Sequence, residues 1–278
     1  MSKKVWLITG CSRGLGRALA EAVLGAGHQL VATARDPISL NDLKEKYGNQ
    51  VRLATVDVTN ENDAGAAVQM AVDAFGKLDM LVNNAGYGTV NSIEERSLDD
   101  FRAEIETNLF GTIIMTKAVI PLMRKQAAGH IIQVSSIGGR IGPTGRAPYA
   151  AAKWGVEGFS ETLSKEVGPI GIKVTIIEPG GFRTDFAGSS TSIREGISAY
   201  DATVGATARF QREYNGKQPG DPQKAANAII QITEVDNPPL RLLLGTDAVT
   251  AAENYDRLKM EADLKWRHLS VSTDFDKY

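Results

Sequence analysis

The chain is poor in cysteine, in histidine and in long hydrophobic runs, and each shortage excludes a class of protein. Cys11 is the only cysteine in 278 residues, so neither an intrachain disulfide nor a cysteine-rich metal site can form. The three histidines are dispersed and lack zinc-ligand spacing, so we expect no bound metal. No apolar run approaches the ~20 residues of a membrane span, and Val5–Thr9 is too short for a secretion signal. These absences predict a cytoplasmic protein without a membrane span.

An excess of charge of one sign is also lacking. The formal net charge is -2, and the basic residues are scattered instead of forming an arm. Nothing in this distribution attracts nucleic acid or an anionic membrane. The content of 42% apolar and 23% charged residues is ordinary for a globular enzyme, so we expect a small-molecule substrate as the partner.

Short β-branched apolar runs alternate with longer segments that have a helical period. The short runs are almost continuously apolar, which is typical of strands covered on both faces. We predict strands over Val5–Thr9, Gln29–Ala34, Val51–Asp57, Met80–Asn83, His130–Ser135 and Ile172–Glu178. We predict helices over Gly14–Leu24, Ser39–Tyr47, Glu61–Phe75, Leu98–Arg124 and Tyr149–Val167. This alternation predicts an α/β fold of Rossmann type, a doubly wound parallel sheet with helices on both faces.

The regular alternation ends at Thr184. Residues 185–220 are rich in Gly, Ser and Thr and have weak periodicity. Because this segment directly follows Thr184 and offers little apolar surface to hold a fixed shape, we expect it to be a mobile lid over the substrate. The alternative interpretation is a surface insertion without a role.

The last part of the chain predicts further regular structure. Gly220-Asp221-Pro222 predicts the start of a helix, because it combines an N-cap residue with a proline in the first turn. Leu240–Leu244 predicts a last strand, and Asp247–Leu269 predicts a polar helix within a C-terminal extension of about 246–278. No linker or internal repeat divides the chain, so we expect a single domain over residues 1–278.

A glycine-rich turn lies between the first predicted strand and the first predicted helix. Glycines there let the backbone approach a pyrophosphate, which lies against the positive end of the helix. The spacing is G-x-x-x-G-x-G, which differs from the common G-x-G-x-x-G dinucleotide fingerprint, and a turn that only serves packing is the alternative. We predict that this loop binds the cofactor through Gly10, Ser12, Arg13, Gly14, Leu15 and Gly16.

The end of the second predicted strand indicates the choice of cofactor. An NAD enzyme usually has a carboxylate there, whereas this strand ends at Ala34 and is followed by Arg35. A planar guanidinium suits a 2′-phosphate, so NADP(H) is favoured. Asp36 precedes Pro37 and is predicted to be a helix N-cap instead of a ribose ligand. A solvated surface charge is the alternative interpretation of Arg35.

Four polar residues form a predicted catalytic group. Tyr149 and Lys153 are four residues apart, so a helix places both side chains on one face, where the cation favours phenolate. Ser136 ends the fifth strand, at the edge where open α/β sheets bind ligands. Asn108 lies inside a predicted helix, where asparagine is a mediocre helix former. Taken singly, these residues also fit a helical surface pair or a locally satisfied amide.

Together these features resemble the short-chain dehydrogenase/reductase family over about residues 3–185. The resemblance rests on motifs in the order and spacing of the family: Thr9-Gly10-x-x-x-Gly14-x-Gly16, Asp57-Val58, Asn83-Asn84-Ala85-Gly86, Asn108, Ser136, Tyr149-x-x-x-Lys153 and Pro179-Gly180. It implies that Tyr149 is the general acid in carbonyl reduction and the base in alcohol oxidation. It further implies that Lys153 lowers the pKa of the tyrosine and holds the nicotinamide ribose. By the same resemblance, Ser136 binds the substrate oxygen and Asn108 positions a water that links Lys153 to solvent.

The resemblance also implies where the cofactor lies. Asp57 and Val58 border the adenine, and the ribose lies by Asn84, Ala85 and Gly86. Four residues after the sixth strand surround the nicotinamide, and they are Pro179, Gly180, Phe182 and Thr184.

The extended C-terminus is similar to the hydroxysteroid- and retinol-dehydrogenase-like branch of the family. We therefore predict an NADP(H)-dependent reductase of ketones or aldehydes, with an apolar substrate as one option, and a homodimer, with a tetramer left open. An alcohol-oxidising dehydrogenase and a non-catalytic NADP-sensing module are the alternatives. A sugar-nucleotide epimerase or dehydratase also uses Y-x-x-x-K, but its glycine loop is usually spaced differently. A module that only senses NADP would not need all four residues of the predicted catalytic group, and all four are present in this sequence.

Overall fold

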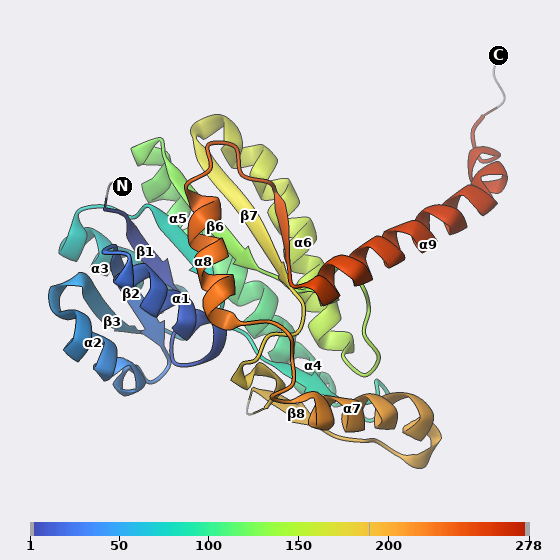
Figure 1. Ribbon diagram of the computed structural model, residues 1–278. Helices are drawn as coiled ribbons and strands as arrows, with labels where there is room; N and C mark the ends of the chain where they lie inside the picture. The colour runs from blue at the N-terminus through green and yellow to red at the C-terminus, as the bar shows by residue number, and fades with distance from the viewer. Residues whose placement is uncertain (1–2, 189, 276–278) are drawn as a thin grey trace.

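The computed structural model describes residues 3–188 and 190–275 (Figure 1). Ser189, inside the predicted lid, and residues 276–278, at the end of the predicted C-terminal extension, lie outside the described residues. The centre is a seven-stranded parallel sheet with the strand order β3-β2-β1-β4-β6-β7-β9. Its strands are β1 Val5–Ile8, β2 Gln29–Ala34, β3 Val51–Thr55, β4 Met80–Asn83, β6 Gly129–Val134, β7 Ile172–Pro179 and β9 Arg241–Leu244.

Helices cover both faces of this sheet, as predicted. One face carries α1 and α8, which pack against each other, while α3, α5 and α6 cover the opposite face (Figure 1). The helices are α1 Gly14–Gly25, α2 Asn41–Tyr47, α3 Glu61–Phe75, α4 Leu98–Ile105, α5 Gly111–Gln126, α6 Ala147–Val167, α7 Ala206–Tyr214, α8 Pro222–Thr233 and α9 Thr246–Val271.

The central strand β1 explains why the apolar runs are continuous. Trp6 and Ile8 are fully buried in the core under α1 and α8. Val5 and Leu7, on the opposite face of the same strand, are fully buried in the core under α3 and α5. All seven predicted strands are present, and their ends differ from the prediction by at most two residues.

Two helix predictions need correction. The predicted helix over Leu98–Arg124 is divided by a π-helical turn at Glu106–Phe110, between α4 and α5. The predicted helix at Ser39 begins earlier, as a 3-10 turn over Pro37–Leu40 that continues into α2. The carboxylate of Asp36 accepts a hydrogen bond from the Ile38 amide, so the predicted N-cap is confirmed.

The segment after β7 holds more structure than its composition indicates. It contains the strand β8 Thr191–Ile193, which pairs in parallel with β5 Gly88–Val90 to form a second, two-stranded sheet. It also contains α7, whose buried Ala208 packs with Val90 and Val204 in a small separate core. Sequence analysis predicted neither strand, because each has only three residues and depends on a distant partner.

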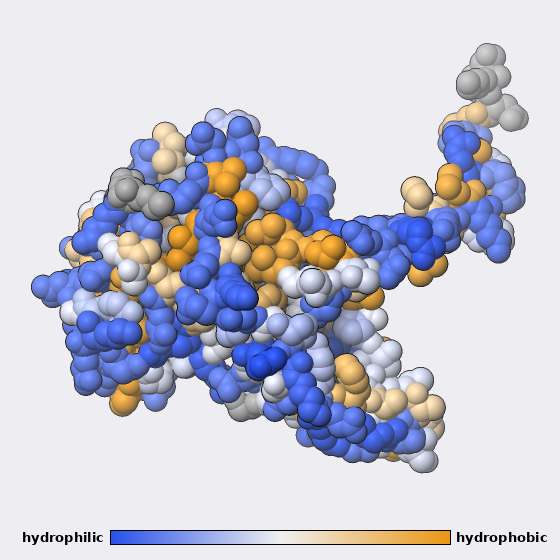
Figure 2. All heavy atoms as spheres, in the orientation of Figure 1, coloured by the Kyte–Doolittle hydropathy of each residue, from blue (hydrophilic) through white to orange (hydrophobic). Residues whose placement is uncertain are grey.

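The last helix, α9, projects away from the body of the molecule (Figure 1). Its first turns bury Ala248 and Ala252, whereas its outer part carries exposed hydrophobic side chains, among them Leu258 and Trp266, between hydrophilic ones (Figure 2). The predicted helix over Asp247–Leu269 is confirmed and is three residues longer, one at its start and two at its end. Across the described ranges, no helix combines the length and the apolar composition that a membrane crossing requires.

Candidate active site

A cavity of about 860 Å³ lies at the carboxyl ends of the parallel strands. The chain segments that follow β1, β2, β3, β4, β6 and β7 all contribute to its lining. Every predicted site residue except Gly16 lines it. These residues are Gly10, Ser12, Arg13, Gly14, Leu15, Arg35, Asp57, Val58, Asn84, Ala85, Gly86, Asn108, Ser136, Tyr149, Lys153, Pro179, Gly180, Phe182 and Thr184.

The glycine loop forms a close-packed cradle at one end of the cavity. Gly10 and Gly14 have positive φ angles of 71° and 62°, a backbone conformation that strains other residues. A Cβ atom on Gly16 would lie 2.3 Å from the Asn84 amide and 2.3 Å from the Gly10 carbonyl oxygen. Gly16 therefore permits the packing behind the loop, and the loop and the start of α1 face the cavity.

Asn84 ties this loop to the end of β4. Its side-chain amide donates to the carbonyls of Thr9 and Gly10 at 2.9 and 3.2 Å. The hydroxyl of Thr9 accepts from the backbone amides of Asn84 and Ala85 at 2.9 and 3.0 Å. These hydrogen bonds hold the glycine loop, which carries the first family motif, against the Asn83-Asn84-Ala85-Gly86 motif at the end of β4.

The groups that would choose between NAD and NADP lie at the ends of β2 and β3. Arg35 is exposed, lines the cavity and forms no ion pair with any described carboxylate. Asp57 accepts hydrogen bonds from the amide and hydroxyl of Thr59, which hold the pKa of its carboxyl below the usual range. With Asp36 used as a cap, Arg35 is the polar group at the end of β2 that is available to a ligand.

We predict that Arg35→Ala weakens the binding of NADPH far more than that of NADH. The loss of one or two charge-assisted hydrogen bonds costs ~1.5–3 kcal/mol each. Fluorescence titration of both cofactors measures the effect, with Lys46→Ala as the control, because it removes an equally exposed cation from the neighbouring α2. Equal weakening of both cofactors would contradict the assignment of Arg35 to the 2′-phosphate.

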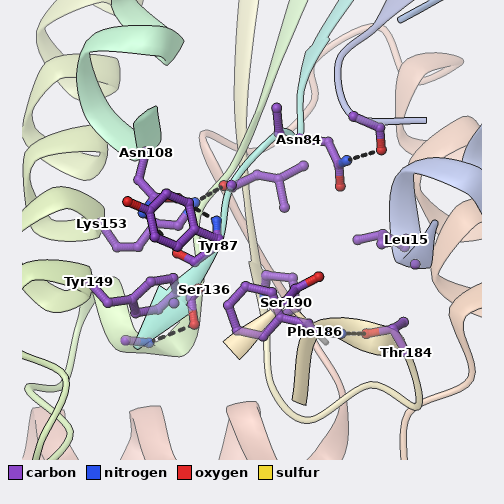
Figure 3. Close-up of a pocket in the computed structure, with 18 of the residues that line it drawn as sticks. Leu15, Asn84, Tyr87, Asn108, Ser136, Tyr149, Lys153, Thr184, Phe186 and Ser190 are labelled. Carbon is purple, nitrogen blue, oxygen red and sulfur yellow. Dashed lines mark hydrogen bonds between the residues drawn. The ribbon is translucent and has the colours of Figure 1, made fainter. Parts of the chain in front are cut away.

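Tyr149, Lys153 and Ser136 converge on the middle of the cavity (Figure 3). Tyr149 and Lys153 lie one turn apart on α6, and the ammonium is 5.7 Å from the centre of the phenol ring. Ser136, in the segment after β6, lies close enough to the phenol to lower its pKa. The backbone amide of Gly138 donates to the Ser136 hydroxyl oxygen at 3.0 Å and fixes its orientation.

Burial has the largest effect on the pKa values of Tyr149 and Lys153. Burial raises the pKa of Tyr149, while the nearby Ser136 hydroxyl and the charge of Arg146 lower it in part. Burial also lowers the pKa of Lys153 to about 8, and its ammonium donates to the Val134 carbonyl at 2.8 Å. The raised pKa keeps the phenol in its protonated form at neutral pH.

Asn108 holds the chain after β4 in place. Its amide nitrogen donates to the carbonyls of Tyr87 and Glu104 at 2.9 and 3.0 Å, and its oxygen accepts from the Tyr87 amide at 3.1 Å. The π-helical turn carries Asn108 and places one extra residue in the helix at this point. A Cβ atom on Gly86 would lie 2.4 Å from the Asn108 oxygen, so glycine is needed there. The predicted role of Asn108 in positioning a water stays a prediction.

Several residues of the cavity were not predicted from the sequence. Tyr87 follows β4, and Phe186 follows β7 and places its ring 5.6 Å from that of Tyr149 (Figure 3). Gln218 is buried, and its side-chain amide has no hydrogen-bond partner in the described chain. Arg146 lies three residues before Tyr149. None of these residues belongs to a recognisable sequence motif. Only the structure shows that Arg146 is buried beside Tyr149.

A parallel sheet that carries a glycine cradle, an exposed arginine and a tyrosine–lysine–serine group at one edge defines a dinucleotide-dependent oxidoreductase. The family model for short chain dehydrogenase matches residues 4–195. The chain therefore belongs to the short-chain dehydrogenase family.

Individual relatives agree with this assignment. Oxidoreductase BOA17 of Botryotinia fuckeliana is 46% identical, over 97% of this chain and 99% of its own length. The 3-ketodihydrosphingosine reductase of Bacteroides thetaiotaomicron is 36% identical, over 88% of this chain and 89% of its own. The crystal structure of a short-chain dehydrogenase from Streptomyces avermitilis has a TM-score of 0.91 and 38% identity, covering 98% of this chain and 99% of that one. The alignments with BOA17 and with the Streptomyces structure thus extend over nearly the whole chain.

Proposed function

We propose that this protein is an NADP(H)-dependent reductase of ketones or aldehydes. The observation that carries the proposal is the convergence of Tyr149, Ser136 and Lys153 in a cavity that also holds the glycine cradle and Arg35. A relative that is named as a reductase of a keto compound supports the reductive direction.

The described residues fit a nicotinamide dinucleotide. The cradle of Gly10 and Gly14 leaves room for a pyrophosphate at the start of α1, and Arg35 offers a guanidinium to a 2′-phosphate at the end of β2. The unpartnered amide of Gln218 offers both a donor and an acceptor to a carboxamide. When bound, this cofactor supplies the hydride for the reaction.

The protein's own groups handle the proton and the developing charge. The Tyr149 phenol donates a proton to the carbonyl oxygen, and the Ser136 hydroxyl donates a hydrogen bond to the same oxygen. Lys153 is held beside Tyr149 by its bond to the Val134 carbonyl, and its positive charge favours loss of the phenolic proton. Phe186 and Ile141 line the same cavity and exclude water from the reacting atoms.

A substrate panel tests the proposed reaction. Oxidation of NADPH is followed with ketones, aldehydes, quinones and steroids, and reduction of NADP with the matching alcohols. We expect turnover with carbonyl compounds that exceeds alcohol oxidation at neutral pH, because the phenol is held in its protonated form. Faster alcohol oxidation would support the alternative dehydrogenase, and cofactor binding without turnover in either direction would support the sensing module.

We further propose that residues 185–220 act as a lid over the substrate. Phe186 contacts Tyr149 and β8 pairs with β5, so this segment reaches the catalytic centre from two points. After β8, Arg209 and Arg212 form exposed ion pairs with Asp201 and Glu195, which stabilise little in water.

We predict that the lid becomes protected when substrate binds. Amide hydrogen exchange is measured on the free protein, on its NADP complex and on the complex with NADP and an unreactive substrate analogue. Exchange in residues 185–220 should slow in the ternary complex, because closure removes these amides from water. Unchanged protection of this segment, alongside normal cofactor protection of the glycine loop, would rule out the lid.

A further inference from the structure

Arg146 places a buried cation beside the catalytic tyrosine. It directly precedes α6, it is 9% exposed, and its side chain lines the cavity. Its guanidinium carbon is 5.9 Å from the centre of the Tyr149 ring. A Cβ atom on Gly88 would lie 3.2 Å from the Arg146 guanidinium and 3.4 Å from the Phe186 ring, so these groups share one small region.

This region differs in charge from the rest of the cavity. The charged side chains in the described lining of the cavity are those of Arg13, Arg35, Asp57, Arg146 and Lys153. The first three belong to the glycine loop and the ends of β2 and β3, where the cofactor phosphates and adenosine are expected. Lys153 already donates to a carbonyl. Arg146 is therefore the one cation of the described lining that lies on the substrate side of Tyr149.

The nearest buried carboxylate is already engaged elsewhere. Glu104 is fully buried, accepts a hydrogen bond from the Thr89 hydroxyl and pairs with Arg96 at 3.5 Å. The hydroxyl of Thr89 also accepts from Arg96, which closes this group of three. No described side chain forms a hydrogen bond or an ion pair with the Arg146 guanidinium. Glu104 therefore acts on Arg146 through its charge but does not pair with it.

An unpaired buried guanidinium is costly to a folded protein. It stays protonated, and burial without a partner forfeits the solvation of its charge. Its planar fork matches a carboxylate through two parallel hydrogen bonds. A negatively charged ligand in the cavity would supply the missing partner of this guanidinium and offset the cost of burying it.

We propose that Arg146 binds the carboxylate of an oxo-acid substrate whose ketone is reduced at Tyr149. This inference rests on the proposed carbonyl reductase function and names its substrate class. In the reaction, the ketone carbon gains a hydride as NADPH is oxidised to NADP, and the ketone oxygen gains the proton of Tyr149. The carboxylate is unchanged, and the product is a hydroxy acid. Phe186, Ile141 and Pro143 also line the cavity and offer apolar surface to the carbon chain between the two groups.

Matched pairs of acids and esters test this assignment. The probes are 3-oxobutanoate, 4-oxopentanoate and 5-oxohexanoate, each compared with its methyl ester, which keeps the ketone but removes the charge. We expect the wild type to prefer the best acid over its ester by about 10- to 100-fold in kcat/KM, through a lower KM. Arg146→Met should abolish this preference by raising the KM of the acid, and Arg146→Lys should restore part of it. Arg102→Met, which removes an exposed arginine of α4, is the control.

The outcomes separate this inference from the proposed function. Turnover of the esters with no preference for any acid would overturn the role of Arg146 and leave the reductase function standing. Equal loss of acid and ester activity in Arg146→Met would show that Arg146 acts on Tyr149 instead of the substrate. Calorimetry of the three acids with the enzyme–NADP complex needs no turnover. Binding that disappears in Arg146→Met supports the anion site, and failure of all three to bind the wild type contradicts it.

Discussion

Replacing Tyr149 by phenylalanine should lower kcat by about a thousandfold while leaving the affinity for NADPH nearly unchanged. The aromatic ring and its contact with Phe186 remain, but the group that donates the proton is lost. Burial raises the pKa of the phenol, so it carries its proton at neutral pH and the variant loses that proton. Single-turnover rates and fluorescence titration with NADPH separate the chemical step from cofactor binding.

Tyr87→Phe is the matched control for this variant. Tyr87 lines the same cavity, but the hydrogen bonds that tie it to Asn108 come from its backbone, so the phenylalanine variant preserves them. It should keep most of the wild-type rate. A Tyr149→Phe enzyme that retains more than about a tenth of that rate would show that another group is the donor.

Replacing Lys153 by methionine should lower kcat by about a hundredfold and also weaken the binding of NADPH. The ammonium lies beside the phenol and is anchored to the Val134 carbonyl, so its loss removes the positive charge that favours phenolate. The family resemblance places the same ammonium on the cofactor ribose, which predicts a second effect on cofactor affinity. Steady-state kinetics and NADPH titration together measure both effects.

The control for Lys153 lies on the same helix. Lys165→Met removes an exposed ammonium near the end of α6, which forms an ion pair with Glu161 one turn earlier. It should match the wild type in both measurements. Loss of kcat in Lys153→Met with unchanged NADPH affinity would confine the lysine to proton transfer and contradict its ribose contact.

The parts of the site that follow from local sequence could be predicted. Tyr149 and Lys153 share a helical face by their spacing alone, and Gly10 and Gly14 mark a turn that other residues cannot adopt without strain. The continuous apolar run of β1 indicated burial on both faces, and the two cores confirm it. Hydrophobic periodicity and turn-forming residues determine local structure within a few positions, so the sequence alone can predict it.

The parts that depend on distant segments could not be predicted. The pairing of β5 with β8 joins residues about a hundred positions apart, and each strand is too short to show a pattern. The π-helical turn at Asn108 was indicated only by a poor helix former inside a helix, because the bonds to Tyr87 that favour it come from another segment. The significance of Arg146 depends on its burial and on the absence of a described partner, neither of which spacing shows.

The transfer of deuterium from NADPH tests the central claim most directly. NADPH that carries deuterium in place of both hydrogens at C4 of the nicotinamide is incubated with the enzyme and the best carbonyl substrate, and the product is analysed by mass spectrometry. The account predicts one deuterium on the carbinol carbon, formed by the wild type about a thousandfold faster than by Tyr149→Phe. An unlabelled product, or equal rates for the two proteins, would contradict a reaction in which Tyr149 donates the proton that accompanies hydride transfer.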